Sequence, residues 1–530
     1  MTKTTKNSKR KIDWRGIVAG VLIITALIGA IIVNMSRTVN DTAKVTGTID
    51  TDNGVLKINW DRYQAVDIDL TDSLTITESG TYHLTGSLAD GYIAVDAGVG
   101  EVRLILDNVS ITNSSGPAII ARSAEDLVIE LNGDNRLEDA TSYASTYDED
   151  VTGAIYSKAD LTFQGDGSLT IVANYQDGII GKDDVKFNSG SYNITSADDG
   201  IRGKDSVYIV GGSFVINSVA DAIKSTNETD AGKGFVMIES GDFNISASGK
   251  GIKAVNSILI YNGNFEIESY DDAVHSNNYV GIVAGNLLIN SGDDGIHADK
   301  ELIIDGGEID IKKAYEGLEA QVITVNGGKI SILASDDGLN AGGGADNSAT
   351  NRTGAGAFDS DISCVLSING GDIYVNAAGD GIDSNGYLYF NGGNVSVDGP
   401  TNNGNGALDS GAGIIMSGGT VVAVGASGMA GTLGESSSVY SASIYFSSAQ
   451  PAGTVVTIKD ASGNVIVSHT SAKAFNHMAV GTTDFKFGET YTIYIDDTEY
   501  QSFTIANNVT TVGNSNMNQY NMPGRQQQNR

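Results

Sequence analysis

A unit of 22 residues recurs through the middle of the chain, and this repeat constrains the fold more than any other feature. In most copies an acidic residue is followed by Gly or Ala and then by an aliphatic residue, as in Asp199-Gly200-Ile201. From Asp177 to Asp380 this position recurs at spacings of 22, 22, 29, 22, 22, 22, 21 and 43 residues. The period is therefore 22, and the longer intervals are interpreted as loop insertions.

Two short alternating segments joined at a pair of glycines separate successive copies, for example over residues 207–216 and 302–311. Alternation with period two is typical of half-buried strands, so each unit holds about three short strands and has no room for a helix. A unit this small buries its apolar face only by stacking on copies of itself. The repeat therefore predicts an all-β fold, a right-handed parallel β-helix. A propeller or a leucine-rich repeat would need a different period or pattern.

Stacked coils are about 4.8 Å apart, so about 12 coils from Ile119 to Leu408 would form a rod of roughly 55–60 Å. The aliphatic residue of each unit is expected to form a ladder inside this rod. Its predicted members are Ile179, Ile201, Ile223, Ile252, Val274, Ile296, Leu318, Leu339 and Ile382.

The same stacking would place the acidic residues in a column with members about 5 Å apart, where two charges repel by about 3 kcal/mol at an effective dielectric of 20. Ca²⁺ would relieve this repulsion, because it accepts six to eight oxygen ligands in loose geometry. The alternative is that Asp-Gly is turn chemistry, with Asp capping its own backbone. The predicted Ca²⁺ ligands are Asp198, Asp199, Asp221, Asp271, Asp272, Asp293, Asp294, Glu316, Asp336, Asp337, Asp380 and Asp383.

A second column is predicted three residues after each acid, pointing outward. It begins with cationic residues, continues with two histidines and ends with acids. Arg and Lys can pair with the carboxylates of an acidic sugar polymer. Alternatively, these cations only balance the neighbouring acids, and zinc at the two histidines is a further alternative. The candidate carbohydrate-binding residues are Arg202, Lys224, Lys250, Lys253, His275 and His297.

The segments 79–86, 104–111 and 154–161, followed by the successive Asp-Asp-Gly-Ile coils, are similar to a clostridial carbohydrate-binding β-helix family. That family binds cellulose and polygalacturonate in its founding member and resembles the family 9 polysaccharide lyases in fold. The resemblance covers roughly residues 45–430. It implies Ca²⁺ on the stacked acids, although Lys250 and Asn405 depart from the acidic pattern. With only two Trp residues for flat stacking platforms, the chain favours acidic sugar over crystalline cellulose.

Three functions fit this pattern. The first is a non-catalytic protein that binds acidic, polygalacturonate-like polysaccharide of a plant cell wall or extracellular matrix. The second is a Ca²⁺-dependent polysaccharide lyase, which needs a base such as Lys224, Lys250 or Lys253 to remove a proton beside the sugar carboxylate. The third is a structural surface protein that Ca²⁺ stiffens. Non-catalytic binding is the function that we expect.

Residues 17–33 are apolar except for Gly and Thr25, and several basic residues precede them. This length spans about 25 Å as a helix, and the positive-inside rule keeps the basic end in the cytoplasm. The segment is predicted to be an uncleaved signal-anchor that leaves the β-helix outside the cell. A cleaved signal peptide, and hence a secreted protein, is the alternative.

The chain contains 65 acidic and 32 basic residues and carries a net charge of −33, which excludes a nucleic-acid-binding surface. Its single cysteine, Cys364, excludes an internal disulfide framework and a cysteine zinc site. After the repeats stop, alternating segments predict a small β cap, which a solenoid needs at its open end. The predicted divisions are a basic tail (1–16), a transmembrane segment (17–33), a stalk (34–48), the β-helix (49–430), the cap (431–510) and a disordered tail (511–530).

Overall fold

The computed structural model describes residues 48–50, 55–230, 232–342 and 361–514, and the chain forms two compact units, residues 1–64 and 65–530. In the first unit β1 (Thr48–Asp50) pairs with β2 (Val55–Lys57) in an antiparallel arrangement, and the short 3₁₀ helix η1 (Trp60–Arg62) follows. The predicted transmembrane segment, 17–33, lies outside the described residues. Among the described residues no helix is long and apolar enough to cross a membrane.

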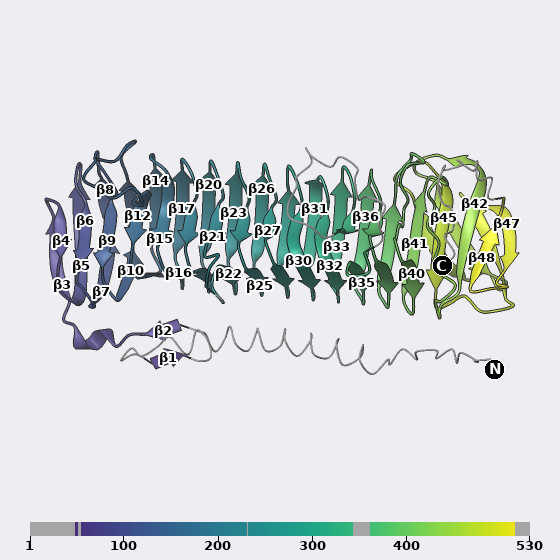
Figure 1. Cartoon of the computed structure of the whole chain (residues 1–530), viewed down its shortest axis with the longest axis horizontal. Helices are drawn as coiled ribbons and strands as arrows, with labels where there is room; N and C mark the ends of the chain where they lie inside the picture. Colours follow the sequence, from purple (N-terminus) through teal and green to yellow (C-terminus); the bar gives the residue numbers. More distant parts are fainter. Residues whose placement is uncertain (1–47, 51–54, 231, 343–360, 515–530) are drawn as a thin grey trace, which may run out of the picture. The chain divides into compact units, whose positions relative to one another are not determined.

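The second unit is a parallel β-solenoid of about 15 turns, which confirms the predicted all-β coil architecture (Figure 1). Sequence reasoning expected about 12 coils because the earliest coils lack the Asp-Gly signature. Those coils begin at Val66, and one of their strands, β7 (Glu101–Asp107), alternates between buried and partly buried side chains without the full acidic, Gly or Ala, aliphatic unit.

Each coil contributes a strand to three columns of parallel strands. In the first column the strands are short and follow the repeated acidic turn. Its members are β4 (Leu74–Ile76), β6 (Ile93–Asp96), β9 (Ile119–Ser123), β12 (Gly153–Ser157), β15 (Asp177–Gly181), β18 (Ile201–Gly203), β21 (Ile223–Ser225), β24 (Ile252–Ala254), β27 (Val274–Ser276), the first parts of β30 (Ile296–Ile304) and β32 (Leu318–Val325), β34 (Leu339–Ala341) and β37 (Ile382–Ser384).

The second column continues each coil before the glycine bend. Its members are β3 (Val66–Leu70), β5 (Gly80–Leu88), β7 (Glu101–Asp107), β10 (Asp126–Asn132), β13 (Asp160–Gly165), β16 (Asp184–Phe187), β19 (Ser206–Ile209), β22 (Phe235–Ile238), β25 (Ser257–Ile260), β28 (Tyr279–Ile282), the ends of β30 and β32, β35 (Val365–Ile368), β38 (Tyr387–Phe390) and β40 (Gly413–Met416).

The third column follows the bend and leads to the next acidic turn. Its members are β8 (Ser110–Thr112), β11 (Asp134–Glu138), β14 (Ser168–Ala173), β17 (Ser191–Ser196), β20 (Ser213–Ser218), β23 (Asp242–Ala247), β26 (Asn264–Ser269), β29 (Asn286–Asn290), β31 (Glu308–Ala314), β33 (Lys329–Ala334), β36 (Asp372–Ala377), β39 (Asn394–Asp398) and β41 (Thr420–Gly425). At the bend between the columns the second glycine of the pair takes a positive φ, 130° at Gly212, which only glycine adopts without strain.

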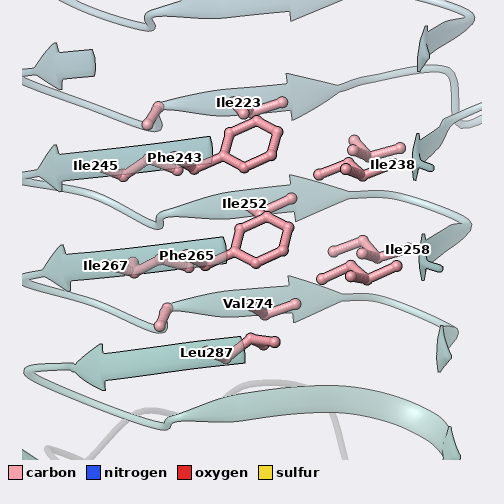
Figure 2. Packing of buried hydrophobic residues seen from close by; sticks show 14 of the residues in the cluster. Ile223, Ile238, Phe243, Ile245, Ile252, Ile258, Phe265, Ile267, Val274 and Leu287 are labelled. Atoms are coloured by element: carbon pink, nitrogen blue, oxygen red, sulfur yellow. The ribbon is translucent and has the colours of Figure 1, made fainter. Parts of the chain in front are cut away.

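The core of the solenoid is a set of ladders, one side chain per coil. The predicted aliphatic ladder from Ile179 to Ile382 is fully buried, with exposed fractions of 0%. Phe214, Phe243 and Phe265 stack with ring centroids 4.9 and 4.6 Å apart. Figure 2 shows Phe243 and Phe265 beside the ladder residues Ile223 and Ile252. Burying one such side chain contributes about 1.5–3 kcal/mol, so these repeated contacts hold neighbouring coils in register.

A C-terminal cap closes the last coil, as the sequence predicts. Strand β41 of the solenoid pairs antiparallel with β45 (Phe475–Thr482), which also pairs with β42 (Ser441–Gln450). The strand β48 (Val509–Val512) extends this sheet from β42. A separate antiparallel sheet has the order β44, β43, β46, β47, and its strands are β44 (Val465–Thr470), β43 (Val455–Asp460), β46 (Thr490–Ile495) and β47 (Thr498–Thr504).

Candidate functional site

The repeated acidic residues form a column, the acid ladder, at the turn between the third and first strand columns. We divide it into N-terminal rungs, central rungs and C-terminal rungs. The N-terminal rungs are Asp177, Asp199 and Asp221, the central rungs are Lys250, Asp272 and Asp294, and the C-terminal rungs are Glu316, Asp337 and Asp380. Most of these side chains are buried, and Asp177, Asp272 and Glu316 are 0% exposed.

One oxygen of most ladder aspartates is used by the backbone of the next coil. The N–H of Asp199 donates to Asp177 Oδ1 at 3.2 Å, that of Asp294 to Asp272 Oδ1 at 2.9 Å, and that of Asp380 to Asp337 Oδ1 at 2.6 Å. These aspartates therefore cap the turn of the neighbouring coil, and the sequence-based alternative that they cap their own turn is wrong at these rungs. The second carboxylate oxygen is left for other partners.

The predicted second column, which we call the outer column, is confirmed rung by rung. The paired strands place Arg202 beside Lys224, His275 beside His297, and Asn340 beside Asp383. Its members in order are Ile180, Arg202, Lys224, Lys253, His275, His297, Glu319, Asn340 and Asp383.

Basic residues of the outer column neutralise the N-terminal rungs. Lys224 Nζ lies 3.1 Å from Asp199 Oδ2 and 3.0 Å from Asp221 Oδ2, and Arg202 lies 3.4 Å from Asp177 Oδ2. Lys253 is more distant, 3.8 Å from Asp221. Burial raises the pKa of Asp221, but the charge of Lys224 and a hydrogen bond from the backbone of the next coil outweigh it, so the net pKa is lowered. Here the alternative that the cations balance the acids describes the geometry well.

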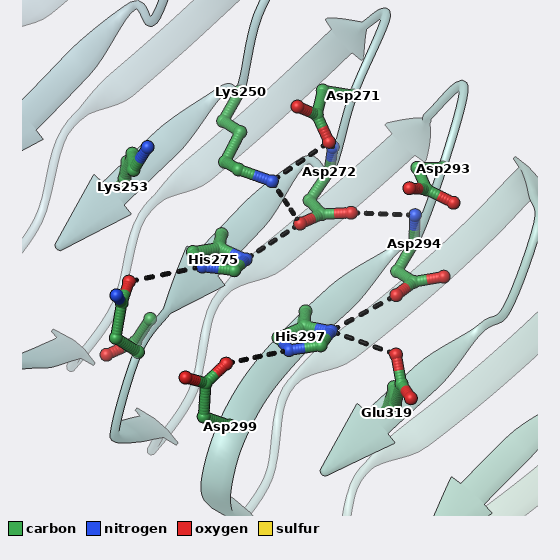
Figure 3. Close-up of polar contacts among 12 residues, drawn as sticks. Lys250, Lys253, Asp271, Asp272, His275, Asp293, Asp294, His297, Asp299 and Glu319 are labelled. Carbon is green, nitrogen blue, oxygen red and sulfur yellow. Dashed lines mark hydrogen bonds and ion pairs between the residues drawn. The ribbon is translucent and has the colours of Figure 1, made fainter. Parts of the chain in front are cut away.

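Lys250 neutralises the central rungs from inside the ladder (Figure 3). Its Nζ lies 2.6 Å from Asp272 Oδ2 and 2.9 Å from Asp271 Oδ1. Burial alone would lower the pKa of Lys250, but the charges and hydrogen bonds of these two carboxylates raise it above its usual range. Lys250 is therefore a permanent cation in the ladder, which explains how a basic residue occupies an otherwise acidic position.

The two histidines are also bound to carboxylates (Figure 3). His275 Nδ1 contacts Asp272 Oδ2 at 2.8 Å, and His297 contacts Asp294, Glu319 and Asp299 at 3.1, 3.0 and 3.1 Å. The imidazole rings stack with centroids 4.8 Å apart. Burial opposes protonation of His297, but its three carboxylate partners raise its pKa to about 12. Ligand atoms of Asp272, His275 and His297, and those of Asp294, His297 and Glu319, lie within 4.8 Å of one another, so the zinc alternative remains a prediction.

At the C-terminal rungs, carboxylates of two neighbouring coils converge. Oxygen atoms of Asp337, Asp380 and Asp383 lie within 4.8 Å of one another. Burial and the charges of Glu316, Asp336 and Asp380 raise the pKa of Asp337 to about 9. In the part of the chain that the structure describes, neither Asp337 nor Asp380 forms an ion pair with a basic side chain.

Asn340, which pairs with Asp383 in the strand register, carries a buried acceptor. Asn340, in the outer column of the Asp337 coil, is 5% exposed and donates from its amide nitrogen to Glu316 at 2.8 Å. Its side-chain oxygen is buried and receives no hydrogen bond within the described residues. An unpaired buried acceptor costs about 1–3 kcal/mol, and a cation would satisfy it. Sequence reasoning placed Asn340 in the column but did not count it as a ligand, because it judged the site by charge.

A hollow of about 650 Å³ lies on the solvent side of the central rungs. Tyr270, which is 81% exposed, lines it together with Asp271, Asp293 and Lys313. Oxygen atoms of Asp271, Asp272 and Asp293 are within 4.8 Å of one another. Sequence reasoning missed Tyr270, although it directly precedes an acid pair at a position where Ala197 and Ser335 are small. An exposed aromatic ring beside carboxylates suits the apolar face of a sugar.

A loop limits where the exposed part of the outer column begins. Tyr143 and Tyr147, from the long segment between β11 and β12, pack on Ile120, Tyr156 and Ile180, the apolar outward residues of the earlier coils. Thr152, at the end of this loop, donates to Asp177 Oδ2 at 2.7 Å and lies 3.3 Å from Arg202. Arg202 is therefore the first polar member of the outer column. The side chains of Arg202, Lys224 and Lys253 are partly exposed, whereas His275 and His297 are buried, which does not suit their predicted contact with carbohydrate.

Comparisons with known proteins identify a family that this chain matches. Residues 71–338 match the family described as carbohydrate-binding domain-containing protein. A carbohydrate-binding domain-containing protein of Acetivibrio thermocellus is 36% identical over 143 residues, which cover 26% of this chain and 50% of the relative. The chain thus spans about half the length of that curated relative. A polysaccharide lyase-like protein from C. thermocellum, solved as a gadolinium derivative, is 30% identical with a TM-score of 0.38, covering 45% of this chain and 96% of that one.

Proposed function

Because this chain belongs to the family of carbohydrate-binding domain-containing proteins, we propose that it binds acidic polysaccharide through Ca²⁺ held at the C-terminal rungs. The observation that carries the proposal is the group formed by Asp337, Asp380 and Asp383, whose oxygens converge within 4.8 Å. Asn340, which pairs with Asp383 in the strand register, adds a buried side-chain oxygen without a donor among the described residues. Three carboxylates and one amide oxygen form a hard, oxygen-only ligand set, the kind that Ca²⁺ prefers.

Calcium fits this set better than magnesium does. Ca²⁺ accepts six to eight oxygens at variable angles, whereas Mg²⁺ needs near-octahedral geometry and keeps most of its waters. Because Oδ1 of Asp337 already accepts a backbone N–H, that side chain offers mainly its second oxygen. The four side chains therefore leave coordination positions open, and a sugar carboxylate can fill them. This open coordination makes the metal a bridge between the acidic protein and an acidic polymer.

The repulsion among these acids supplies the driving force for metal binding. A pKa of about 9 for Asp337 means that at neutral pH the group keeps a proton rather than add another negative charge. Ca²⁺ would replace this proton and neutralise the neighbouring charges together. The N-terminal rungs gain much less from a metal, because Lys224 and Arg202 already neutralise Asp199, Asp221 and Asp177.

The path proposed for the polysaccharide runs along the solenoid from the C-terminal rungs toward Tyr270. Its ring is exposed for stacking with a sugar, and Lys313 in the same hollow offers a cation to a sugar carboxylate. Arg202, Lys224 and Lys253 remain 27%, 23% and 31% exposed despite their ion pairs. Their positive charges can attract an acidic polymer, although they are not its main ligands in this proposal.

A lyase is less well supported, because the candidate bases are held protonated. The pKa of Lys250 is raised far above its usual range and that of Lys224 is also raised, in both cases by carboxylate neighbours that outweigh burial. A general base must be deprotonated near the operating pH. Lys253, 3.8 Å from Asp221, is the remaining candidate base of the three.

The proposed setting is the cell surface. The segment 17–33 would anchor the chain in the membrane and leave the solenoid outside, where acidic polymers of a plant cell wall or extracellular matrix are its partners. The sequence features that support this are the apolar run and the basic residues before it. A secreted form, cleaved after the run, would bind the same polymers.

Affinity electrophoresis of the full-length protein in polygalacturonate gels, with Ca²⁺ or with EGTA, tests the proposal. We expect retardation only with Ca²⁺, and loss of retardation in Asp337→Asn/Asp380→Asn, in which the amides preserve the backbone caps. Asp199→Asn is the matched control from the same ladder and should behave as wild type. Ca²⁺-induced thermal stabilisation without retardation would contradict the binding function and favour a metal-stiffened rod. Release of unsaturated uronates would favour the lyase.

A further inference from the structure

A second hollow lies in the C-terminal cap, outside the family-matched residues 71–338. Its volume is about 650 Å³. Its walls come from β42, β45, β47 and the ends of two loops, and the lining residues are Ser427, Tyr445, Phe446, Ser447, Asn476, Tyr500, Gln501, Gly513 and Asn514. This volume is within the range of small-ligand sites.

An irregularity in strand pairing creates the hollow. Tyr445 of β42 pairs with His477 of β45, but the next registered pair is Gln450 with Phe475. Residues 446–449 of β42 therefore stand opposite the single residue Asn476. A bulge of this kind bends the strand away from its partner and redirects side chains, and such bulges are common beside binding sites.

The walls are fixed in place although the strand is irregular. The hydroxyl of Tyr500 accepts a hydrogen bond from the N–H of Ser447 at 3.1 Å, which ties β47 to the bulge. The rings of Phe446 and Tyr500 have centroids 5.5 Å apart, and Tyr445 lies 4.8 Å from the ring of His477. A cavity held by such contacts is preorganised, so a ligand need not order it on binding.

One polar atom in this wall has no partner. The side-chain oxygen of Asn476 is enclosed, and within the described residues no group donates a hydrogen bond to it. Asn476 also lies in the stretch of β45 that the bulge leaves without a regular partner. A hydroxyl group of a ligand entering the hollow would satisfy this acceptor.

The lining also indicates the charge of the ligand. In a chain with a net charge of −33, none of the residues that line the hollow is charged. Amide and hydroxyl groups can both donate hydrogen bonds to sugar hydroxyls and accept hydrogen bonds from them. Tyr and Phe rings stack on the apolar faces of sugars. We infer that the cap holds a second, metal-independent binding site for an uncharged saccharide. This site goes beyond the proposed function, because it needs neither the acid ladder nor Ca²⁺.

Affinity electrophoresis of the full-length protein in EGTA, with hydroxyethylcellulose, xyloglucan or galactomannan in the gel, tests this inference. Wild type should be retarded by at least one of these neutral polymers. Asn476→Leu and Tyr500→Ala should each weaken that retardation roughly tenfold in apparent Kd, the loss expected for one good buried contact. Tyr494→Ala is the matched control, because Tyr494 lies in the same sheet as Tyr500 but does not line the hollow.

Thermal melting of each variant shows whether it is folded, and Tyr500→Phe, which keeps the ring, provides a milder change if the alanine variant unfolds. Retardation by none of the three polymers, or equal retardation of wild type and folded Asn476→Leu, would overturn the inference. Ca²⁺-dependent retardation in polygalacturonate is measured in parallel. It should be unchanged in the cap variants, so failure of the cap site and failure of the proposed function give different patterns.

Discussion

The N-terminal and C-terminal rungs share one backbone geometry but differ in their counter-charges. Asp199 and Asp337 both accept the N–H of the next coil through Oδ1, at 3.1 and 2.6 Å. Beside Asp199 stand Lys224 and Arg202, whereas beside Asp337 stand Asp336 and Asp380. The repeat therefore reproduces the carboxylate in each coil, and the neighbouring side chains decide whether it becomes a structural ion pair or a candidate metal ligand.

The pKa values differ most between Asp221 and Asp337, whereas burial raises the pKa of Asp177 to about 6 and also raises that of Asp199. The pKa of Asp221 is lowered, because Lys224 outweighs burial, while that of Asp337 is raised to about 9, because burial and three acids act together. Lys250 lies between these two sets of rungs and supplies a cation to Asp271 and Asp272. Four predictions test how far this comparison holds.

Removing Lys250 should have the largest effect. Lys250→Met leaves Asp271 and Asp272 without their shared cation, and loss of one partner from a buried pair costs about 3–5 kcal/mol. We expect Ca²⁺ to restore much of this loss, because the central rungs then resemble the C-terminal ones. Thermal unfolding with Ca²⁺ and with EGTA measures both effects. Lys312→Met, at an exposed ion pair with Asp310, should cost less than about 1 kcal/mol.

Neutralising the C-terminal rungs should abolish most of the response to Ca²⁺. At a free Ca²⁺ concentration of 100 times Kd, binding stabilises the folded state by about 2.7 kcal/mol, which Asp337→Asn/Asp380→Asn should lose. Denaturant unfolding with and without Ca²⁺ gives this difference directly. An undiminished Ca²⁺ response in the double variant would place the metal elsewhere.

The metal-free protein should lose stability as pH rises. The folded pKa of Asp337, about 9, lies above its ordinary value of 3.8, so the folded state binds the extra proton between these two pH values. Stability from this group is complete below pH 3.8 and is lost progressively up to about pH 9, with a slope approaching about 1.4 kcal/mol per pH unit. Unfolding of EGTA-treated protein between pH 5 and pH 9 is compared with that of Asp337→Asn, whose slope should be shallower by this amount.

Tyr270→Ala should have the smallest effect. Loss of one stacking ring costs about 1 kcal/mol, which corresponds to roughly a fivefold weaker Kd for polygalacturonate with Ca²⁺. The melting temperature should not change, because the side chain is 81% exposed. Tyr261→Ala, at a partly exposed tyrosine outside this hollow, is the control. Equal affinities of the two variants would remove Tyr270 from the proposed path.

Much of the architecture could be predicted because the 22-residue period determines register. Once one aliphatic residue per coil points inward, the residue after it must point outward, so Arg202, Lys224, His275 and Asp383 aligned as expected. The earliest coils were missed in the coil count, because their alternation lacks the acidic signature. The transmembrane, calcium and polysaccharide predictions remain predictions.

The details of the site could not be read from the repeat, because they depend on where long side chains reach. Lys250 extends to Asp271 and Asp272 of the following coil, and His297 contacts carboxylates on either side. The Asn340 oxygen lacks a donor because of how neighbouring side chains pack. The bulge opposite Asn476 depends on strand pairing in the cap, where the 22-residue spacing no longer applies. Sequence spacing supplied the columns, whereas packing determined which members are neutralised.

The most direct test of the central claim is to locate the metal. Crystals of the protein soaked in CaCl₂ should show anomalous scattering at the C-terminal rungs, within coordination distance of Asp337, Asp380 and Asp383. The account predicts no comparable peak beside Asp199 and Asp221, where Lys224 already supplies the positive charge. A calcium peak at those N-terminal rungs, with none at the C-terminal rungs, would contradict it.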